Sequence, residues 1–163
     1  MGEAAPGRGD GSPCPFCPDP GGKIPGVVVW EEELLRVIMD RYPVAPGHLL
    51  ILPRRHHDSI DAIPVPVLAR IAIVSRAAVA ALRRVMRSDG ASIVVQLGQA
   101  ASQSVAHVHW HVVPRWTGDG LHHDDGDRTV FTYRHAEVAG WVLEEQARGL
   151  RAALGRALED GAR

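Results

Sequence analysis

Residues 107–113 read HVHWHVV, three histidines separated by single apolar residues. Such strict alternation predicts a β-strand, here over 107–115, in which residues i, i+2 and i+4 share one face. We therefore expect the imidazoles of His107, His109 and His111 on one side of a sheet. Three adjacent buried imidazoles cannot all satisfy one another cheaply. The stretch indicates a zinc site or a nucleophilic histidine more than a polar sheet face, and alternation alone does not choose between the first two.

Outward from this stretch, the remaining strands and helices indicate an α+β domain. Runs rich in β-forming residues predict strands over 27–30, 34–41, 48–54 and 91–98. Apolar residues at three- and four-residue spacing predict helices over 65–86 and 140–158. Because the strands follow one another without regular intervening helices, we expect a mainly antiparallel five-stranded sheet with a long central helix and a C-terminal helix.

The 163 residues fit a single domain, which we place at 14–163 after a disordered Gly-, Pro- and Ala-rich tail at 1–13. The formal net charge of -1 argues against a nucleic-acid binder, which is usually basic. The sequence shows no apolar run approaching about 18 residues and no secretory signal, so we expect no membrane partner and a cytoplasmic location.

Cys14 and Cys17 form a CPFC motif near the start of this domain. In the cytoplasm, two cysteines at this spacing indicate metal ligands, a redox pair or free thiols rather than a structural disulfide. One CxxC is half of a zinc site. A thioredoxin-like role does not fit, because no βαβ pattern follows the motif.

Several motifs in a fixed order resemble the histidine triad (HIT) family. HVHWHVV matches the triad, QSVAHVHWHVVPR its flanks, MDRYPVAPGHLLILPRRH an upstream family segment, and CPFC the cysteine pair of many members. Agreement in order over residues 14 to about 119 is far more specific than any one motif. The resemblance implies a HIT-like fold, a sheet continued across a homodimer, and a nucleotide site beside the triad. The C-terminal helix also has apolar residues to spare for a dimer contact.

The resemblance assigns a role to each matching residue. His109 is the nucleophile that attacks the α-phosphorus of a nucleoside 5′-phosphoryl compound, and His111 and His107 flank it. The expected substrate contacts are Asp40 at the ribose hydroxyls, His48 close to the site, and Gln96, Gln103 and Ser104 near the phosphate or leaving group.

The resemblance also completes the metal site and shows one departure. Cys14 and Cys17 would be joined by His56, for which His57 could substitute, and by His107 around a structural zinc; no organic cofactor is expected. Ser102 stands where the family often has glycine, the residue that allows a backbone to approach phosphate closely, so the resemblance does not fix the geometry of this loop.

The leading function is hydrolysis or transfer through a nucleotidyl-histidine, with a purine-type nucleotide as substrate. Four kinds of leaving group are consistent with the sequence: an amine, an acyl group, a phosphate and another nucleotide. The alternatives are a dinucleoside polyphosphate phosphorylase or nucleotidyltransferase, a nucleotide-binding module with little activity, and a hydrolase in which His109 binds zinc. The acidic, His-containing stretch 117–129 is expected to be a solvated loop.

Overall fold

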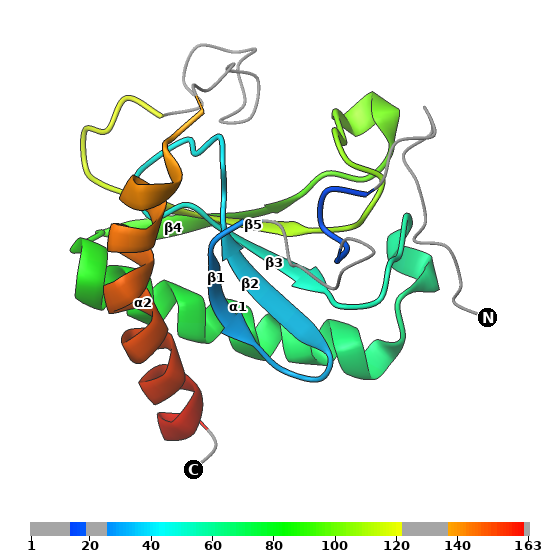
Figure 1. The fold of residues 1–163 in the computed structure, drawn as a ribbon, viewed down its shortest axis with the longest axis horizontal. Coiled ribbons are helices and arrows are strands. Elements are labelled where there is room, and N and C mark those ends of the chain that lie inside the picture. Colours follow the sequence, from blue (N-terminus) through cyan, green and yellow to red (C-terminus); the bar gives the residue numbers. More distant parts are fainter. Residues whose placement is uncertain (1–13, 19–25, 122–136, 162–163) are drawn as a thin grey trace.

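The computed structural model describes residues 14–18, 26–121 and 137–161. The predicted tail at 1–13 and most of the predicted loop at 117–129 lie outside these residues. Five strands form one antiparallel sheet in the order β1-β2-β3-β5-β4 (Figure 1). Their bounds are β1 Val28–Glu31, β2 Leu35–Met39, β3 Leu49–Pro53, β4 Gly90–Val95 and β5 Trp110–Arg115. The predicted α+β class and five-stranded sheet are confirmed.

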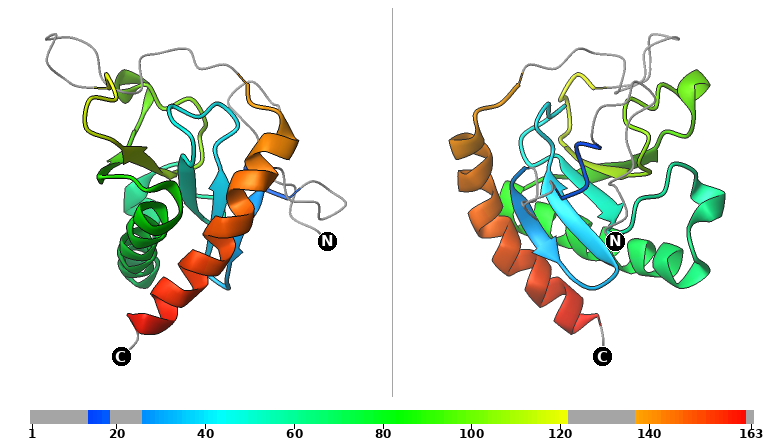
Figure 2. Two further views of the ribbon diagram at one scale, coloured as in Figure 1. Left: turned by 90° about the vertical axis from the view of Figure 1, so that its left-hand side faces the viewer. Right: turned by 45° about the vertical axis from the view of Figure 1, so that its right-hand side comes forward.

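Helix α1 (Val65–Met86) crosses one face of the sheet, and α2 (Gly140–Asp160) packs against α1 and β1 (Figures 1 and 2). Two short 3-10 helices, η1 (Ile60–Ala62) and η2 (Gln99–Ala101), lie in the connections. Alternate residues of β2 and β3 divide between the two faces: Val37 and Ile51 join the core under the helices, whereas Ile38 and Leu50 join a smaller cluster on the other face. That second face carries the site.

Helix α1 matches its predicted bounds and supplies much of the core. Its inner stripe is buried, with Ile71, Val74 and Leu82 at or below 3% exposure. By length and composition alone α1 could cross a membrane, contrary to the sequence expectation. One such helix is weak evidence, since the core helix of a soluble protein passes the same test, and α1 packs against β2, β3, β5 and α2 as a core helix does.

The predicted strand over 107–115 is too long at its start, because β5 begins at Trp110. The ladder with β3 ends at the Ile51–Trp110 pair. Before that point the backbone turns to other partners: the Val108 N–H donates to the His57 carbonyl at 2.7 Å. Of the three triad histidines, only His111 lies in the strand, although all three are buried.

The apolar stripe of α2 is buried in the core of the single chain. Leu143, Ala147, Leu150 and Leu154 are each at most 4% exposed within the single chain, where they belong to the core under α1. Helix α1 and strand β1 cover this stripe, so the large apolar side chain that α2 leaves exposed for a contact is Trp141, at 77%.

Candidate active site

A cavity of about 790 Å³ lies over the second face of the sheet, beside the triad. His109 and His111 line its floor. One wall is formed by the turn after β2 and the start of α2, and the other by the segment that follows β4 and contains η2. These two walls lie on opposite sides of β5 (Figures 1 and 2). The wall residues include Asp40, Tyr42 and Val138 on the first side and Gln96, Ser102 and Ser104 on the second.

His109 is held in one orientation by its own backbone neighbourhood. Its Nδ1 lies 2.7 Å from the His107 carbonyl oxygen. A carbonyl can only accept, so Nδ1 carries the proton and Nε2 keeps its lone pair. The Phe16 ring packs edge-on against this imidazole, with 4.9 Å between ring centroids. His109 therefore presents an unprotonated nitrogen from a fixed ring.

His111 is oriented by a second histidine. The Val44 N–H donates to His48 Nδ1 at 3.1 Å, which makes that nitrogen an acceptor. His48 Nε2 then carries the proton and donates to His111 Nδ1 at 3.0 Å. We assign from this network the proton of neutral His111 to Nε2. The carboxylate of Asp40 lies nearby, with Oδ2 at 3.4 Å from His48 Nδ1 and 3.8 Å from His111 Nδ1. The Val44 N–H is closer to His48, so it determines the tautomer.

Burial keeps both site imidazoles neutral. Desolvation lowers the pKa of His109, and it lowers the pKa of His111 to about 3, helped by the neighbouring His109 and His48. The Asp40 carboxylate opposes both shifts but does not outweigh burial. At neutral pH one ring offers a lone pair and the other offers an N–H, which is the pairing that nucleophilic attack on a phosphoryl group requires.

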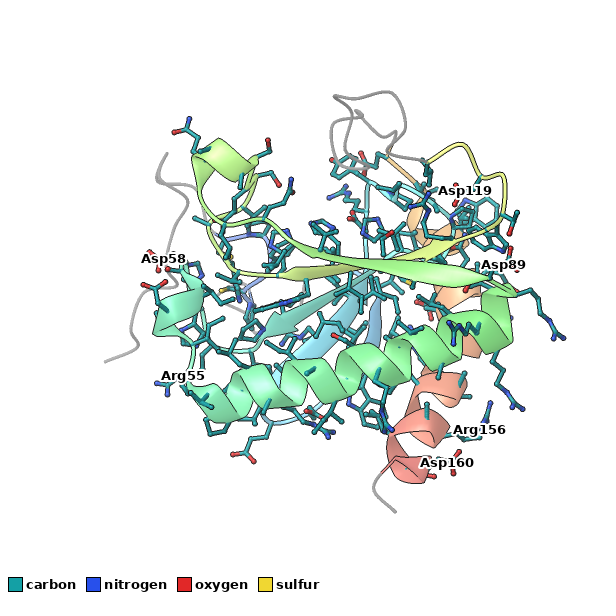
Figure 3. The ribbon with its side chains drawn as sticks, turned by 180° about the vertical axis from the view of Figure 1, so that it is seen from behind. Arg55, Asp58, Asp89, Asp119, Arg156 and Asp160 are labelled. Atoms are coloured by element: carbon teal, nitrogen blue, oxygen red, sulfur yellow. The ribbon has the colours of Figure 1, made fainter. Side chains whose placement is uncertain are left out.

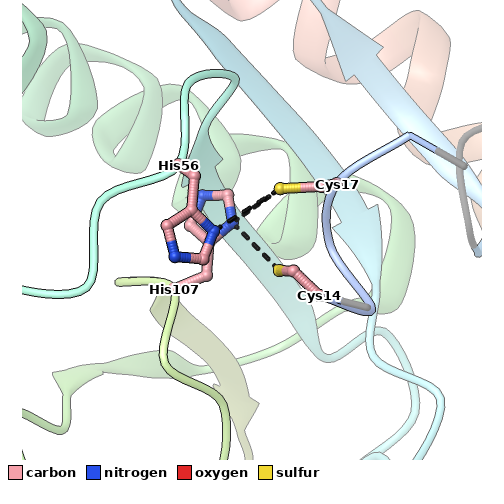
Figure 4. Close-up of side chains that lie close together, drawn as sticks. All are labelled: Cys14, Cys17, His56 and His107. Carbon is pink, nitrogen blue, oxygen red and sulfur yellow. Dashed lines mark hydrogen bonds between the residues drawn. The ribbon is translucent and has the colours of Figure 1, made fainter. Parts of the chain in front are cut away.

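The predicted metal ligands meet on the other side of His109. Cys14 Sγ lies 3.5 Å from His107 Nδ1, and Cys17 Sγ lies 3.5 Å from His56 Nδ1 and 3.6 Å from His107 Nδ1 (Figure 4). The four ligand atoms are all within 4.8 Å of one another. His56 comes from the segment bounded by Arg55 and Asp58, at the end of the sheet opposite the turns of Asp89 and Asp119 (Figure 3).

This donor set fits a tetrahedral zinc. Zn–S and Zn–N bonds of about 2.3 and 2.0 Å in a tetrahedron give S···N edges of roughly 3.5 Å, close to the separations seen here. His107 Nε2 lies 3.0 Å from the Pro53 carbonyl and donates to it, which leaves Nδ1 as the lone-pair nitrogen facing the sulfurs. Burial raises the pKa of Cys17 to about 12 despite the nearby Arg36 guanidinium, so a thiolate here needs the further positive charge that a metal would bring.

Phe16 joins the cysteine pair to the cavity. Its N–H donates to Cys14 Sγ at 3.4 Å, its carbonyl accepts from Arg36 Nη1 at 3.3 Å, and the residue lines the cavity. Arg36 is itself buried in β2 and paired with Glu31 at 2.8 Å. Sequence reasoning missed both residues. An aromatic residue between the cysteines was the available signal for Phe16, and a lone arginine in an apolar strand was the signal for Arg36.

Four of the five predicted substrate-binding residues line the cavity, and the fifth, Gln103, does not. Asp40, His48, Gln96 and Ser104 line the cavity. Gln103 is not among the lining residues: its Oε1 accepts from Gly98 N at 2.6 Å, and its Nε2 donates to the Val105 carbonyl. The ring of His107 also points away from the cavity, toward Cys14 and the Pro53 carbonyl, and only its backbone carbonyl contacts His109. Val138, just before α2, and Leu143 of α2 also line the cavity, and sequence reasoning named neither as a site residue.

The serine that replaces glycine keeps the backbone that a glycine would adopt. Ser102 has φ 63° and ψ 28°, in the left-handed region, at the end of η2. The loop therefore forms its turn with serine in place of glycine.

This sheet and these clusters are those of a histidine triad protein. The HIT domain model matches residues 21–118, and the chain belongs to the HIT family. Among relatives, a HIT-like protein of Methanocaldococcus jannaschii is 36% identical over 107 residues, which is 66% of this chain and 82% of the relative.

Two relatives carry names that state an activity on nucleotides. An adenylylsulfatase of Arabidopsis thaliana is 32% identical over 66% of this chain and 55% of its own length. An AP-4-A phosphorylase of Mycobacterium tuberculosis is 34% identical over 58% of this chain and 49% of its own length. The crystal structure of a Zn-bound histidine triad family protein from Mycobacterium smegmatis has a TM-score of 0.69 and 33% identity, covering 88% of this chain and 92% of that chain.

Proposed function

We propose that the chain is a nucleotide hydrolase or transferase that forms a covalent nucleotidyl-histidine on His109. The observation that carries the proposal is the 2.7 Å hydrogen bond from His109 Nδ1 to the His107 carbonyl, which leaves Nε2 as the nucleophilic nitrogen of a cavity-lining residue. The names of the two nucleotide-acting relatives support the same substrate class.

The reaction follows from the two tautomers. His109 Nε2 attacks the α-phosphorus, an N–P bond forms, and the bond from phosphorus to the leaving group breaks with its electron pair going to that group. The Nε2–H of His111 stabilises charge that develops on the phosphoryl oxygens or the leaving group. In the second step water attacks phosphorus and gives up a proton to solvent, the N–P bond breaks with its electron pair returning to Nε2, and the neutral imidazole leaves. Asp40 would hold the ribose hydroxyls of a purine-type nucleotide at the first wall.

Zinc has a structural place in this proposal. Cys14, Cys17, His56 and His107 would hold it, and it would supply fixed geometry rather than chemistry at phosphorus. Because His107 offers its ring to this cluster and its carbonyl to His109, the metal would order the backbone that orients the nucleophile.

A phosphorylase is the second candidate. The likeness to an AP-4-A phosphorylase favours it, because the covalent step is shared and only the acceptor differs, phosphate in place of water. A comparison of product formation with and without inorganic phosphate distinguishes the two.

The test of the proposed function is to trap the intermediate. The protein is mixed with phosphoramidate, acyl-nucleotide, nucleotidyl-sulfate and dinucleoside polyphosphate substrates carrying labelled α-phosphorus, then quenched and digested. We expect acid-labile label on the peptide that contains His109 for at least one substrate. Turnover without any labelled peptide, or label on another residue, contradicts the proposal.

We also propose a homodimer in which β4 continues the sheet into a second copy. β4 pairs with β5 alone in the described chain, so its outer edge is an unpaired template. Ile93 on this strand and Ile73 on α1 are 47% and 44% exposed. Light scattering should give twice the mass of the chain at micromolar concentration, and Ile93→Asp should give a monomer; a monomeric parent protein overturns the proposal.

A further inference from the structure

The backbone of Ser102 is the starting point. Among the residues that the structure describes, only Arg87 and Ser102 combine a side chain with a positive φ, at 56° and 63°. Left-handed backbone disfavours any residue with a Cβ. Both residues follow the last turn of a helix, Arg87 after α1 and Ser102 after η2, and of the two only Ser102 lines the cavity. A strained residue persists when its surroundings fix it, and such residues gather at functional sites.

Hydrogen bonds on both sides of Ser102 fix its conformation. Gly98 is bound twice by Gln103, whose Oε1 accepts from the Gly98 N–H at 2.6 Å and whose own N–H donates to the Gly98 carbonyl at 3.2 Å. Within this closed loop the Ser102 N–H donates to the Gln99 carbonyl at 2.9 Å. The loop therefore holds residue 102 in the left-handed region whichever side chain it carries.

The loop presents Ser102 to the cavity, on the wall that also carries Gln96 and Ser104. The ribose site at Asp40 lies on the opposite wall, with His109 on the floor between them. A nucleotide with its ribose at Asp40 and its α-phosphorus at His109 would extend its leaving group toward the loop that follows β4. The hydroxyls of Ser102 and Ser104 are donors on that side.

We infer that Ser102 is a specificity-determining residue for the leaving group. Its hydroxyl donates to an oxygen of an oxyacid leaving group, such as a carboxylate or sulfate, and so favours these groups over an alkylamine, which offers no such acceptor. This inference rests on the proposed nucleotidyl transfer at His109. It explains why the chain keeps a strained serine where glycine would be more stable.

The experiment separates the hydroxyl from the backbone. Ser102→Gly removes both hydroxyl and strain, whereas Ser102→Ala removes only the hydroxyl. With two substrates that share adenosine 5′-phosphate, one releasing sulfate and one an alkylamine, we expect both variants to lose about tenfold in kcat/KM on the first and to be unchanged on the second. The thermal midpoint should rise in Ser102→Gly alone.

Arg87→Gly is the matched control, because it relieves the same strain at a residue that does not line the cavity. It should raise the midpoint and leave the preference between substrates unchanged. A Ser102→Gly enzyme with the parent preference overturns the inference, and so does an equal loss on both substrates, which would mark a purely structural residue.

Equilibrium binding keeps the test independent of turnover. In a His109→Ala background, the affinities for the sulfate and alkylamine compounds are measured with and without Ser102→Ala. A selective loss for the sulfate compound supports the inference even where no labelled His109 is found. Equal affinities throughout overturn it, even where turnover establishes the proposed function.

Discussion

Two clusters built around histidines flank His109, and their partners make them different. On one side, Cys14, Cys17, His56 and His107 bring sulfur and nitrogen atoms within 4.8 Å of one another. On the other, Asp40, His48 and His111 form a set that meets the same distance limit but contains a carboxylate and no sulfur. The first has the donors of a structural zinc site. The second is a hydrogen-bonded chain that ends at the cavity.

The comparison shows that the partner of each ring, more than its place in the HxHxH motif, decides its task. The ring of His107 has Pro53 and the cysteines as partners and faces away from the cavity. The ring of His111, four residues later, has His48 as partner and faces the cavity. His109 lies between them and receives its orientation from the His107 carbonyl.

The largest effect should come from deleting the imidazole between the clusters. We expect His109→Ala to lower kcat/KM by more than about a thousandfold, because the covalent step is lost, while the thermal midpoint changes little. Steady-state kinetics and thermal unfolding measure the two. His57→Ala is the matched deletion, since that ring belongs to neither cluster, and it should keep most of the turnover. Substantial activity in His109→Ala would show that the nucleophile lies elsewhere.

Removing a sulfur should break the first cluster without touching the second. We expect Cys14→Ser to lose the single equivalent of zinc predicted per chain and several kcal/mol of unfolding free energy. Elemental analysis and urea unfolding check both losses, and chelation of the parent protein should reproduce them. The discrimination between ribo- and deoxyribonucleotides should survive in whatever activity remains. A parent protein that is purified without zinc, and whose unfolding free energy does not change on chelation, would rule out the zinc site.

Asp40 tests the second cluster. If its carboxylate holds both ribose hydroxyls, a 2′-deoxy substrate loses about 1.5–3 kcal/mol, or roughly ten- to a hundredfold in kcat/KM, and Asp40→Ala shrinks that gap. The structure also shows a turn-capping role, since Asp40 Oδ1 accepts from the Tyr42 N–H at 2.8 Å. Asp40→Asn can keep this cap and lose the charge. A ratio that is unchanged in Asp40→Ala, beside lower stability, would leave Asp40 as a cap alone.

The smallest expected effect on turnover comes from mild acid, which should act on stability instead. Burial lowers the pKa of His107 to about 4 in the metal-free chain and that of His111 to about 3, whereas in the unfolded chain both titrate near 6.5. The unfolded state therefore binds more protons below pH 6.5, and the stability of the metal-free protein should fall as the pH drops from 6.5 toward 4.

The same shifts predict that catalysis is less sensitive to mild acid than an ordinary imidazole would be. The single-turnover rate constant should fall less between pH 7.5 and 6 than it would with an exposed imidazole, because burial lowers the pKa of both His109 and His111. Urea unfolding and rapid-quench kinetics at matched pH values provide the measurements. A rate that falls with an apparent pKa near 6.5 would contradict the buried, neutral pair.

The periodicity of apolar residues predicted the helices and strands well, but it did not predict which distant segments contact them. The spacing of apolar residues predicted α1 to the residue, since one face of a helix repeats within the sequence itself. The start of β5 was misplaced because the alternation continues through His107 and His109 after the neighbouring strand has ended, and a single segment cannot report where its partner stops. The α2 wall of the cavity was missed for the same reason.

The candidate site was predictable where motifs carry it. The CxxC and HxHxH motifs, together with the family resemblance, indicated the ligands that the fold brings together. Phe16 and Arg36 were missed, because their roles depend on contacts with segments distant in the sequence. Gln103 shows the converse: its motif indicated a substrate contact, whereas the structure shows its amide closing the loop on Gly98 and Val105.

His107 has a consequence for the order in which the chain matures. Cys14 and His107 are 93 residues apart, and the first wall of the cavity uses α2 near the end of the chain. Contacts this distant form late, and during synthesis the cysteines leave the ribosome long before His107. The nascent chain therefore carries both cysteines without the His107 ring until residue 107 has been added. Because the ring of His107 completes the Cys14–Cys17–His56 cluster and its carbonyl orients His109, both arrangements form in the same late step.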